Sequence, residues 1–198
     1  MEFIKEYLEE VVEIANKINL EQIERAVKIL IDIRERSGRV FVLGVGGSSA
    51  TASHAVNDLR KICGIESYAP TDNVAELTAI TNDEGWENSF CDWLYESNLR
   101  EDDCLLIFSV GGGNREKHIS ENLIKAIHSA NASGARVISI VGRDGGYIQE
   151  YSHSTILIPV VNPERITPHT EGFASIVLHL LVSHPLLQAY KTKWESQK

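Results

Sequence analysis

Two stretches at the start of the chain carry apolar residues at the spacing of an α-helix. In residues 2–18 and 20–36, apolar positions recur every three or four residues, and acidic residues fill many of the positions between them. Asn19 separates the stretches, so the pattern predicts a helical hairpin over residues 1–37. A hairpin this apolar must cover another surface. We expect that surface to belong to a partner subunit, because the rest of the chain already predicts a complete domain.

From residue 38 onward, short apolar runs alternate with longer amphipathic stretches. The runs 105–108 and 137–141 are almost continuously apolar, as in strands that are buried on both faces of a parallel sheet. This alternation predicts an α/β fold, a three-layer sandwich with a five-stranded parallel sheet between helices. The predicted strands are 39–43, 66–69, 103–109, 135–141 and 154–158, and the predicted helices are 47–63, 74–80, 84–99, 115–132 and 168–183, with a C-terminal piece after Pro185. We expect a single domain over 1–198, with its sheet core in 38–198.

A glycine–serine turn, residues 44–49 (GVGGSS), lies between the first predicted strand and a predicted helix. Such a turn exposes backbone N–H groups at the positive end of the helix dipole, and Gly46, Gly47 and Ser48 therefore predict a phosphate site. The dinucleotide-binding pattern fits less well, since Ser49 stands at its last glycine, although Glu66 could serve as its ribose-binding acid. A plain strand-to-helix turn without a ligand is the remaining interpretation.

Two further small-residue turns follow later strands, at 109–114 (SVGGGN) and 142–146 (GRDGG). Three consecutive glycines cost backbone entropy, so they indicate a ligand or another backbone at close range. Because ligands bind beyond the carboxyl ends of parallel strands, the three turns together predict a binding site at one edge of the sheet. Its candidate residues in the second turn are Ser109, Gly111, Gly112 and Asn114.

Two pairs of proton-transfer or metal-binding side chains lie on predicted helices. His54 and Asp58 are four residues apart, and Glu171 and His179 are eight apart, so each pair shares a helix face. Imidazole and carboxylate groups suit general acid–base catalysis or zinc binding. A surface contact for the first pair and a core histidine at His179 are the structural alternatives. Together with the phosphate-type turns, the pairs predict an enzyme that acts on a phosphorylated small molecule.

Composition limits the classes of partner that the protein could bind. The 198 residues include 19 Lys and Arg against 28 Asp and Glu, a net charge of −9, which argues against binding nucleic acid or an anionic membrane. The three cysteines are isolated, as expected for thiols in a reducing compartment. The acidic, amphipathic start does not resemble a signal peptide, and no run approaches the ~20 apolar residues of a membrane span. We therefore expect a cytoplasmic protein.

The chain resembles the sugar isomerase (SIS) domain proteins and, among them, the sedoheptulose 7-phosphate isomerases, also called phosphoheptose isomerases. The resemblance covers nearly the whole chain. It rests on the helical start, the turn 44–48 followed by His54, the segment 77–83 (LTAITND), the turn 142–146, and the late helix with Glu171 and His179. It implies the SIS fold and a homotetramer with active sites at subunit interfaces. It also implies an aldose–ketose isomerisation of a heptose phosphate, feeding bacterial surface or nucleotide-activated heptose synthesis.

The resemblance further implies a set of zinc ligands made of two histidines and two acids, two of which would also transfer protons. These are His54, Asp58, Glu171 and His179, with Asp58 and His179 as the proton carriers. Ser48 and Ser109 would hold the phosphate, and Asn82 and Asp83 would meet the sugar.

The chain also departs from the family pattern. The family usually has Glu at Asp58 and Gln at Glu171, and its serine-rich and threonine-rich phosphate loop is replaced by glycines at 111–113. The altered loop favours an alternative, a non-catalytic SIS protein that acts as a sugar-phosphate sensor or tetrameric adaptor. The retained histidines and acids favour the enzyme. A nicotinamide-dependent dehydrogenase is the third interpretation.

Overall fold

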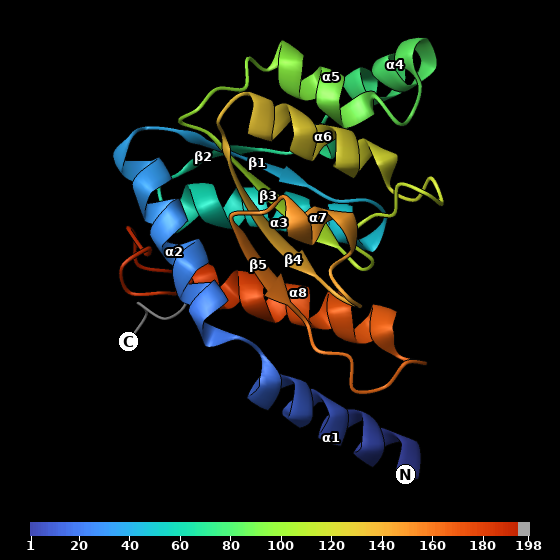
Figure 1. Ribbon diagram of the computed structural model, residues 1–198. Coiled ribbons are helices and arrows are strands. Elements are labelled where there is room, and N and C mark those ends of the chain that lie inside the picture. Colours follow the sequence, from blue (N-terminus) through green and yellow to red (C-terminus); the bar gives the residue numbers. More distant parts are fainter. Residues whose placement is uncertain (194–198) are drawn as a thin grey trace.

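A computed structural model describes residues 1–193 and shows a five-stranded sheet surrounded by helices (Figure 1). The strands are β1 Arg39–Leu43, β2 Glu66–Tyr68, β3 Cys104–Ser109, β4 Arg136–Val141 and β5 Ser154–Leu157. The α-helices are α1 Glu2–Lys17, α2 Leu20–Glu35, α3 Gly47–Lys61, α4 Val74–Glu84, α5 Ser89–Glu96, α6 Glu121–Ala132, α7 Gly146–Glu150 and α8 Ile166–Val182, with a 3-10 turn η1 at Pro70–Asp72.

All four strand pairings are parallel, and the strand order is β2-β1-β3-β4-β5. The predicted α/β architecture with a five-stranded parallel sheet is confirmed. Because β1 lies between β2 and β3, the winding direction reverses there, and a crevice opens beyond the carboxyl ends of β1 and β3. The glycine turns at 44–49 and 109–114 follow these two strands, so both reach the crevice.

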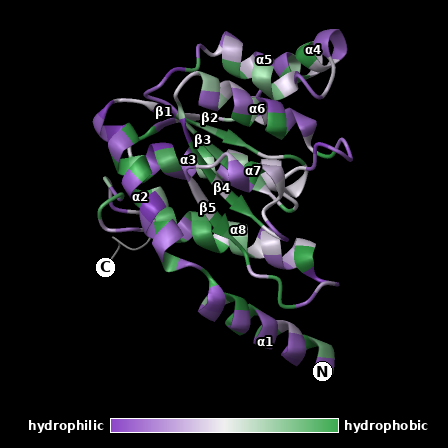
Figure 2. Cartoon of the chain, in the orientation of Figure 1, coloured by the Kyte–Doolittle hydropathy of each residue, from purple (hydrophilic) through white to green (hydrophobic). Residues whose placement is uncertain are grey.

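Alternate side chains of the central strands feed two separate cores, which makes three layers. On one face, Val42, Leu106 and Ile140 pack with helices α2, α3 and α8. On the other face, Leu43 and Leu105 pack with α5 and α6. Figure 2 shows the strands as predominantly hydrophobic, in contrast to the mixed surfaces of the outer helices. Burial on both faces explains why the strand sequences lack a polar alternation.

The helices differ from the prediction in four places. The predicted helix 84–99 is divided differently, because α4 ends at Glu84, before Gly85 with its φ of 88° that glycine tolerates, and α5 runs only from Ser89 to Glu96. The predicted helix 115–132 begins at Glu121, after a loop. The short helix α7 was not predicted. The expected piece after Pro185 is a turn in the described part, and residues 194–198 lie outside it.

Helices α1 and α2 are present, but they form an open elbow instead of a closed hairpin. Figure 1 shows α1 leading away from the body while α2 lies along the sheet. On α1, Ile4, Leu8 and Val12 remain 59%, 59% and 61% exposed. Within the described part of the chain, no element covers these side chains, because the second helix has turned toward the sheet.

A polar cluster holds the middle of α1 against the segment that leads into α8. The Glu10 carboxylate accepts hydrogen bonds from Asn162 Nδ2 at 2.7 Å and Arg165 at 2.7 Å, and its Oε2 lies 2.6 Å from His169 Nε2. Hydrogen bonds from Asn162, then His169, lower the pKa of Glu10 to about 2. The cluster therefore fixes the start of α8 relative to α1.

Two expectations from composition can be compared with the structure. Cys63 and Cys104 are buried, and desolvation raises the pKa of both thiols, that of Cys63 to about 12, so they are inert core residues. Among the described residues, no helix combines the length and apolar character that crossing a membrane requires.

Candidate active site

A cavity of about 1180 Å³ lies at the carboxyl edge of the sheet, where the sequence predicted a site. It is bounded by the glycine turns after β1, β3 and β4 and by the start of α8. Among the predicted residues, those that line it are Ser48, Ser109, Gly111, Asn114 and Glu171. The cavity is therefore built from segments that are far apart in the sequence.

The first turn presents free donors at the start of α3. Gly46 has φ 64° and ψ −127°, a conformation that glycine allows and that turns the chain from β1 into the helix. Among residues 1–193, none accepts a hydrogen bond from the N–H groups of Gly47 and Ser48. Ser48, only 8% exposed, adds a hydroxyl on the cavity wall. These donors and the helix dipole suit an anion.

Backbone hydrogen bonds join the second turn to the third turn and the start of α7, and this contact is called the clasp below. Tyr147 N donates to Gly113 O at 3.1 Å, and Ile148 N donates to Gly112 O at 2.8 Å. A Cβ on Gly112 would lie 1.9 Å from Gly145 O. The glycines therefore allow a close backbone approach, and the third turn uses its helix N–H groups internally. Ser109 Oγ supports the clasp by accepting a hydrogen bond from Gly112 N at 3.1 Å.

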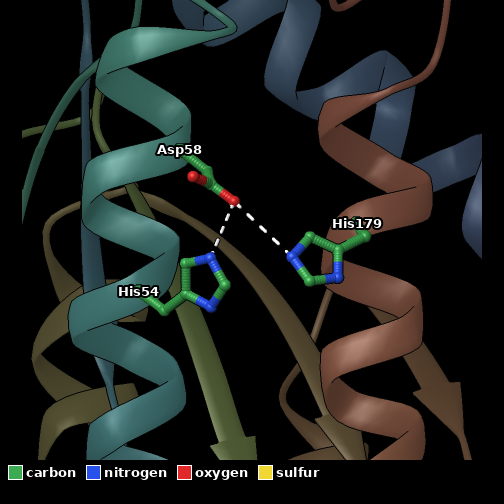
Figure 3. Close-up of side chains that lie close together, drawn as sticks. All are labelled: His54, Asp58 and His179. Atoms are coloured by element: carbon green, nitrogen blue, oxygen red, sulfur yellow. Dashed lines mark ion pairs between the residues drawn. The ribbon is translucent and has the colours of Figure 1, made fainter. Parts of the chain in front are cut away.

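His54, Asp58 and His179 converge between α3 and α8. Figure 3 shows the Asp58 carboxylate directed at both imidazoles, with Oδ2 lying 3.2 Å from His54 Nε2 and 3.8 Å from His179 Nε2. The two rings are edge to face, with centroids 5.0 Å apart. Asn57 Nδ2 donates to the other carboxylate oxygen at 2.9 Å. Asp58 is 7% exposed, whereas both histidine side chains are about half exposed, at 46% and 52%.

These three side chains suit a zinc ion. One donor atom from each lies within 4.8 Å of the others, and imidazole nitrogen and carboxylate oxygen are preferred zinc ligands. Ligands bound tetrahedrally at 2.0–2.1 Å lie roughly 3.3 Å apart, close to the 3.2 Å and 3.8 Å separations around Asp58 Oδ2. Three protein ligands also leave a fourth position for substrate, as catalytic zinc sites do.

Glu171, grouped with these ligands from the sequence, lies elsewhere. A Cβ on Gly47 would stand 2.6 Å from Glu171 Oε1, so the carboxylate lies beside the start of α3. Gly47 and Glu171 pair near the starts of α3 and α8, whereas the His54–Asp58–His179 cluster lies two turns further along both helices. Eight residues of helix span about 12 Å, so Glu171 and His179 share one face of α8 but lie far apart along its axis.

The remaining predicted residues lie at or beyond the margin of the cavity. Asn82 and Asp83, at the end of α4, are exposed, hydrogen-bond each other at 2.8 Å, and are absent from the cavity wall. Gly112 is buried in the clasp, and Gly46 and Gly47 shape the turn beside Ser48 without lining the cavity themselves.

Three cationic residues on the cavity wall were not predicted from the sequence. Arg115 and Lys117 lie on a loop closed by paired backbone hydrogen bonds between Asn114 and Ile119, and Arg143 passes over Gly111. The polar run 115–118 falls within the predicted helix 115–132. Its lack of apolar residues at helical spacing was the signal that could have identified this loop.

Comparison with known proteins agrees with this architecture. Residues 4–142 match the model of the SIS domain family, and the chain therefore belongs to that family. Within it, the chain belongs to the phosphoheptose isomerase group, being 32% identical to the phosphoheptose isomerase of Geotalea daltonii over 81% of this chain and 80% of that protein.

Two further relatives show the range of the group. The structure of a phosphoheptose isomerase from Francisella tularensis superposes with a TM-score of 0.78 at 26% identity, covering 91% of this chain and 95% of that one. The lincomycin biosynthesis protein LmbN of Streptomyces lincolnensis is 32% identical over 82% of this chain. The match spans only 59% of that longer protein.

Proposed function

We propose that the protein is an aldose–ketose isomerase that converts sedoheptulose 7-phosphate to a heptose 7-phosphate through an enediol, in the cytoplasm. Its product would enter bacterial surface or nucleotide-activated heptose synthesis. The observation that carries the proposal is a His–Asp–His cluster held between α3 and α8, two helices whose first turns border one cavity, with an anion-type turn at the start of α3. Phosphoheptose isomerases among the relatives supply the substrate class.

The cavity supplies what a phosphorylated sugar requires. The free N–H groups of Gly47 and Ser48 and the hydroxyls of Ser48 and Ser109 are neutral donors, and Asn114 adds a polar wall. Such donors bind an anionic group without a large positive charge, consistent with the acidic chain. The sugar would extend from this end into the cavity.

His54, Asp58 and His179 would hold a zinc ion. When bound, zinc would polarise the substrate carbonyl and stabilise the negative charge that develops on oxygen. Serving as zinc ligands would occupy the Asp58 carboxylate and both imidazoles. Asp58 and His179 were also predicted to carry protons, and the cluster geometry favours the ligand role for both.

The site is proposed to be completed by neighbouring copies in a homotetramer. His54 and His179 are half exposed. On α8, which carries His179, Ile176 and Leu180 are 49% and 42% exposed. Together with the uncovered face of α1, these side chains suit a subunit interface. Light scattering should give a tetramer mass, and a charged substitution at Leu8 on α1 should reduce it. A monomeric wild-type protein would contradict this part of the proposal.

The proposed reaction is tested by following sedoheptulose 7-phosphate with the purified protein by proton NMR. We expect an aldose product, loss of turnover after chelation, and recovery with Zn²⁺. H179Q should abolish turnover by removing a ligand, whereas H184Q, five residues further on and 3.7 Å from Glu24, is the matched histidine control. Binding of the sugar phosphate without turnover would support the sensor alternative and overturn the isomerase.

A further inference from the structure

We infer that a second cavity, beside strand β5, is a binding site for the phosphoryl group of a small anionic metabolite. This edge cavity has a volume of about 480 Å³ and lies where the α1–α2 elbow meets α7 and β5, a strand at the edge of the sheet. Its volume is within the range of roughly 300–1,000 Å³ that is usual for small-molecule sites. It shares no lining residue with the cavity at the carboxyl edge, so the inference goes beyond the proposed isomerase function.

Two side-chain amides on the wall of the edge cavity have their oxygens occupied inside the fold. Gln22 Oε1 accepts hydrogen bonds from Ser154 Oγ and Thr155 N, both at 3.2 Å. Asn19 Oδ1 accepts from the backbone N–H groups of Glu21 and Gln22, at 2.9 Å and 3.2 Å. Because a backbone N–H can only donate, these bonds fix the orientation of both amides. Within residues 1–193, neither NH₂ group has a hydrogen-bond partner, so both remain available as donors on the cavity wall.

His153 adds a third donor of fixed identity. Its backbone N donates to Val137 O at 2.8 Å, and its ring Nδ1 accepts from Val137 N at 3.1 Å. Burial, followed by the charges of Arg136 and Arg25, lowers the pKa of His153, so the ring is neutral at pH 7. Since Nδ1 is an acceptor, the proton of the neutral ring is on Nε2, which has no partner among the described residues.

The charge of the wall completes the argument for an anion. Arg25 lines the edge cavity and forms no ion pair or hydrogen bond within residues 1–193, whereas Lys17 is held 2.5 Å from Glu13. No acidic side chain of the described chain lines this cavity, although the whole protein carries a net charge of −9. A guanidinium and three N–H donors without an opposing acid suit an oxyanion.

The distribution of the donors favours a phosphoryl group over a carboxylate. Asn19 lies in the elbow, Gln22 and Arg25 lie on α2, and His153 immediately precedes β5. A phosphoryl group presents three oxygens to donors that come from three segments, whereas a carboxylate presents two. The cavity is also larger than a phosphate ion, so we expect the phosphoryl group to belong to a larger molecule.

The substitution R25Q tests the assignment by isothermal titration with inorganic phosphate, against potassium chloride at the same ionic strength. Hydrogen bonds to a charged group contribute about 1.5–3 kcal/mol, so R25Q should weaken one phosphate-binding event at least about tenfold. K28Q is the matched control, because it removes a positive charge from the exposed side of the same helix, outside the edge cavity. Its phosphate affinity should remain within about twofold of wild type.

The substitution Q22E gives a second test that preserves the internal hydrogen bonds. A glutamate keeps an oxygen for Ser154 and Thr155, but it replaces the NH₂ group on the cavity wall with a negatively charged oxygen. Q22E should therefore lose the same binding event as R25Q, while its turnover of sedoheptulose 7-phosphate and its circular dichroism spectrum stay close to wild type.

Glycerol 3-phosphate serves as the probe for a phosphorylated metabolite and should show the same dependence on Arg25 and Gln22. Binding of inorganic phosphate alone would indicate a bare-ion site and overturn the assignment to a metabolite. Phosphate binding that R25Q and Q22E leave unchanged, or no binding to the wild type, overturns the inference and leaves the proposed isomerase in place. Absence of turnover in a wild-type protein that shows the expected titrations removes the isomerase alone.

Discussion

The two glycine-rich turns at the cavity, residues 44–49 and 109–114, look alike in sequence but use glycine for different contacts. In the first turn, Gly47 leaves space for the Glu171 side chain, and a Cβ at Gly46 would meet no atom within 4 Å. In the second turn, a Cβ at Gly112 would meet the backbone of Gly145. A glycine in the sequence therefore does not show whether a side chain, as at Gly47, or another backbone, as at Gly112, lies against it. The first turn borders the cavity beside Glu171, and the second is held to the third turn and the start of α7 by backbone hydrogen bonds that keep the cavity wall together.

The largest expected effect is therefore on stability, at Gly112. In G112A the new Cβ would stand 1.9 Å from the Gly145 carbonyl oxygen, at a backbone φ of +65°. Neither backbone can move without breaking the hydrogen bond from Ile148 to Gly112. We expect a loss of roughly 3 kcal/mol or more in the free energy of unfolding, measured by denaturant titration.

The adjacent glycine provides the control for this change. A Cβ at Gly111 would meet only the Arg143 side chain, at an ordinary 3.8 Å. G111A should therefore lose less than about 1 kcal/mol. Equal losses in G111A and G112A would show that the clasp is not what requires glycine.

Gly47 should show the opposite balance, with a larger effect on catalysis than on stability. In G47A the Cβ would displace the Glu171 carboxylate, the free end of a flexible side chain, so the fold should change by less than about 1 kcal/mol. We expect kcat/KM to fall at least about tenfold, because the displaced carboxylate would disturb the cavity wall beside Ser48, where the phosphate is proposed to bind. Steady-state kinetics on sedoheptulose 7-phosphate measures this change.

The double variant G47A/E171Q shows whether the two residues act through one another. If the glycine acts only by positioning the carboxylate, the double variant should be no slower than E171Q alone. Additive losses would mean that Gly47 contributes to catalysis by another route, such as its own N–H group at the phosphate.

Much of the fold could be predicted because burial leaves a direct trace in the sequence. Strands β3 and β4 are buried on both faces, so their apolar runs identified them within a residue or two. The loop 114–119 was missed, because helical periodicity resumes at α6 and the charged residues before it could belong to an exposed helix face. The elbow between α1 and α2 was missed because periodicity identifies an apolar face without showing what packs against it.

The candidate site was predictable to the same extent. The spacing of His54 and Asp58 fixed a common helix face, the family resemblance grouped His179 and Glu171 with them, and the structure brings His179 but not Glu171 to that cluster. The spacing of Glu171 and His179 also fixes a common face, but eight residues separate them by about 12 Å along the axis. Sequence therefore indicated the helices and the faces that carry the cluster. Which side chains meet along α3 and α8 depends on how the sheet positions the two helices.

Gly172 should show the smallest effect, and one of opposite sign. It lies inside α8, it is exposed, and a Cβ there would meet no atom within 4 Å. Alanine in an open helix interior avoids the entropy cost of glycine, so G172A should raise the free energy of unfolding by about 0.5–1 kcal/mol. Denaturant titration at a fixed protein concentration measures this gain. A loss instead would mean that another surface approaches Gly172 in the assembled protein, and glycine next to Glu171 would then mark a subunit contact.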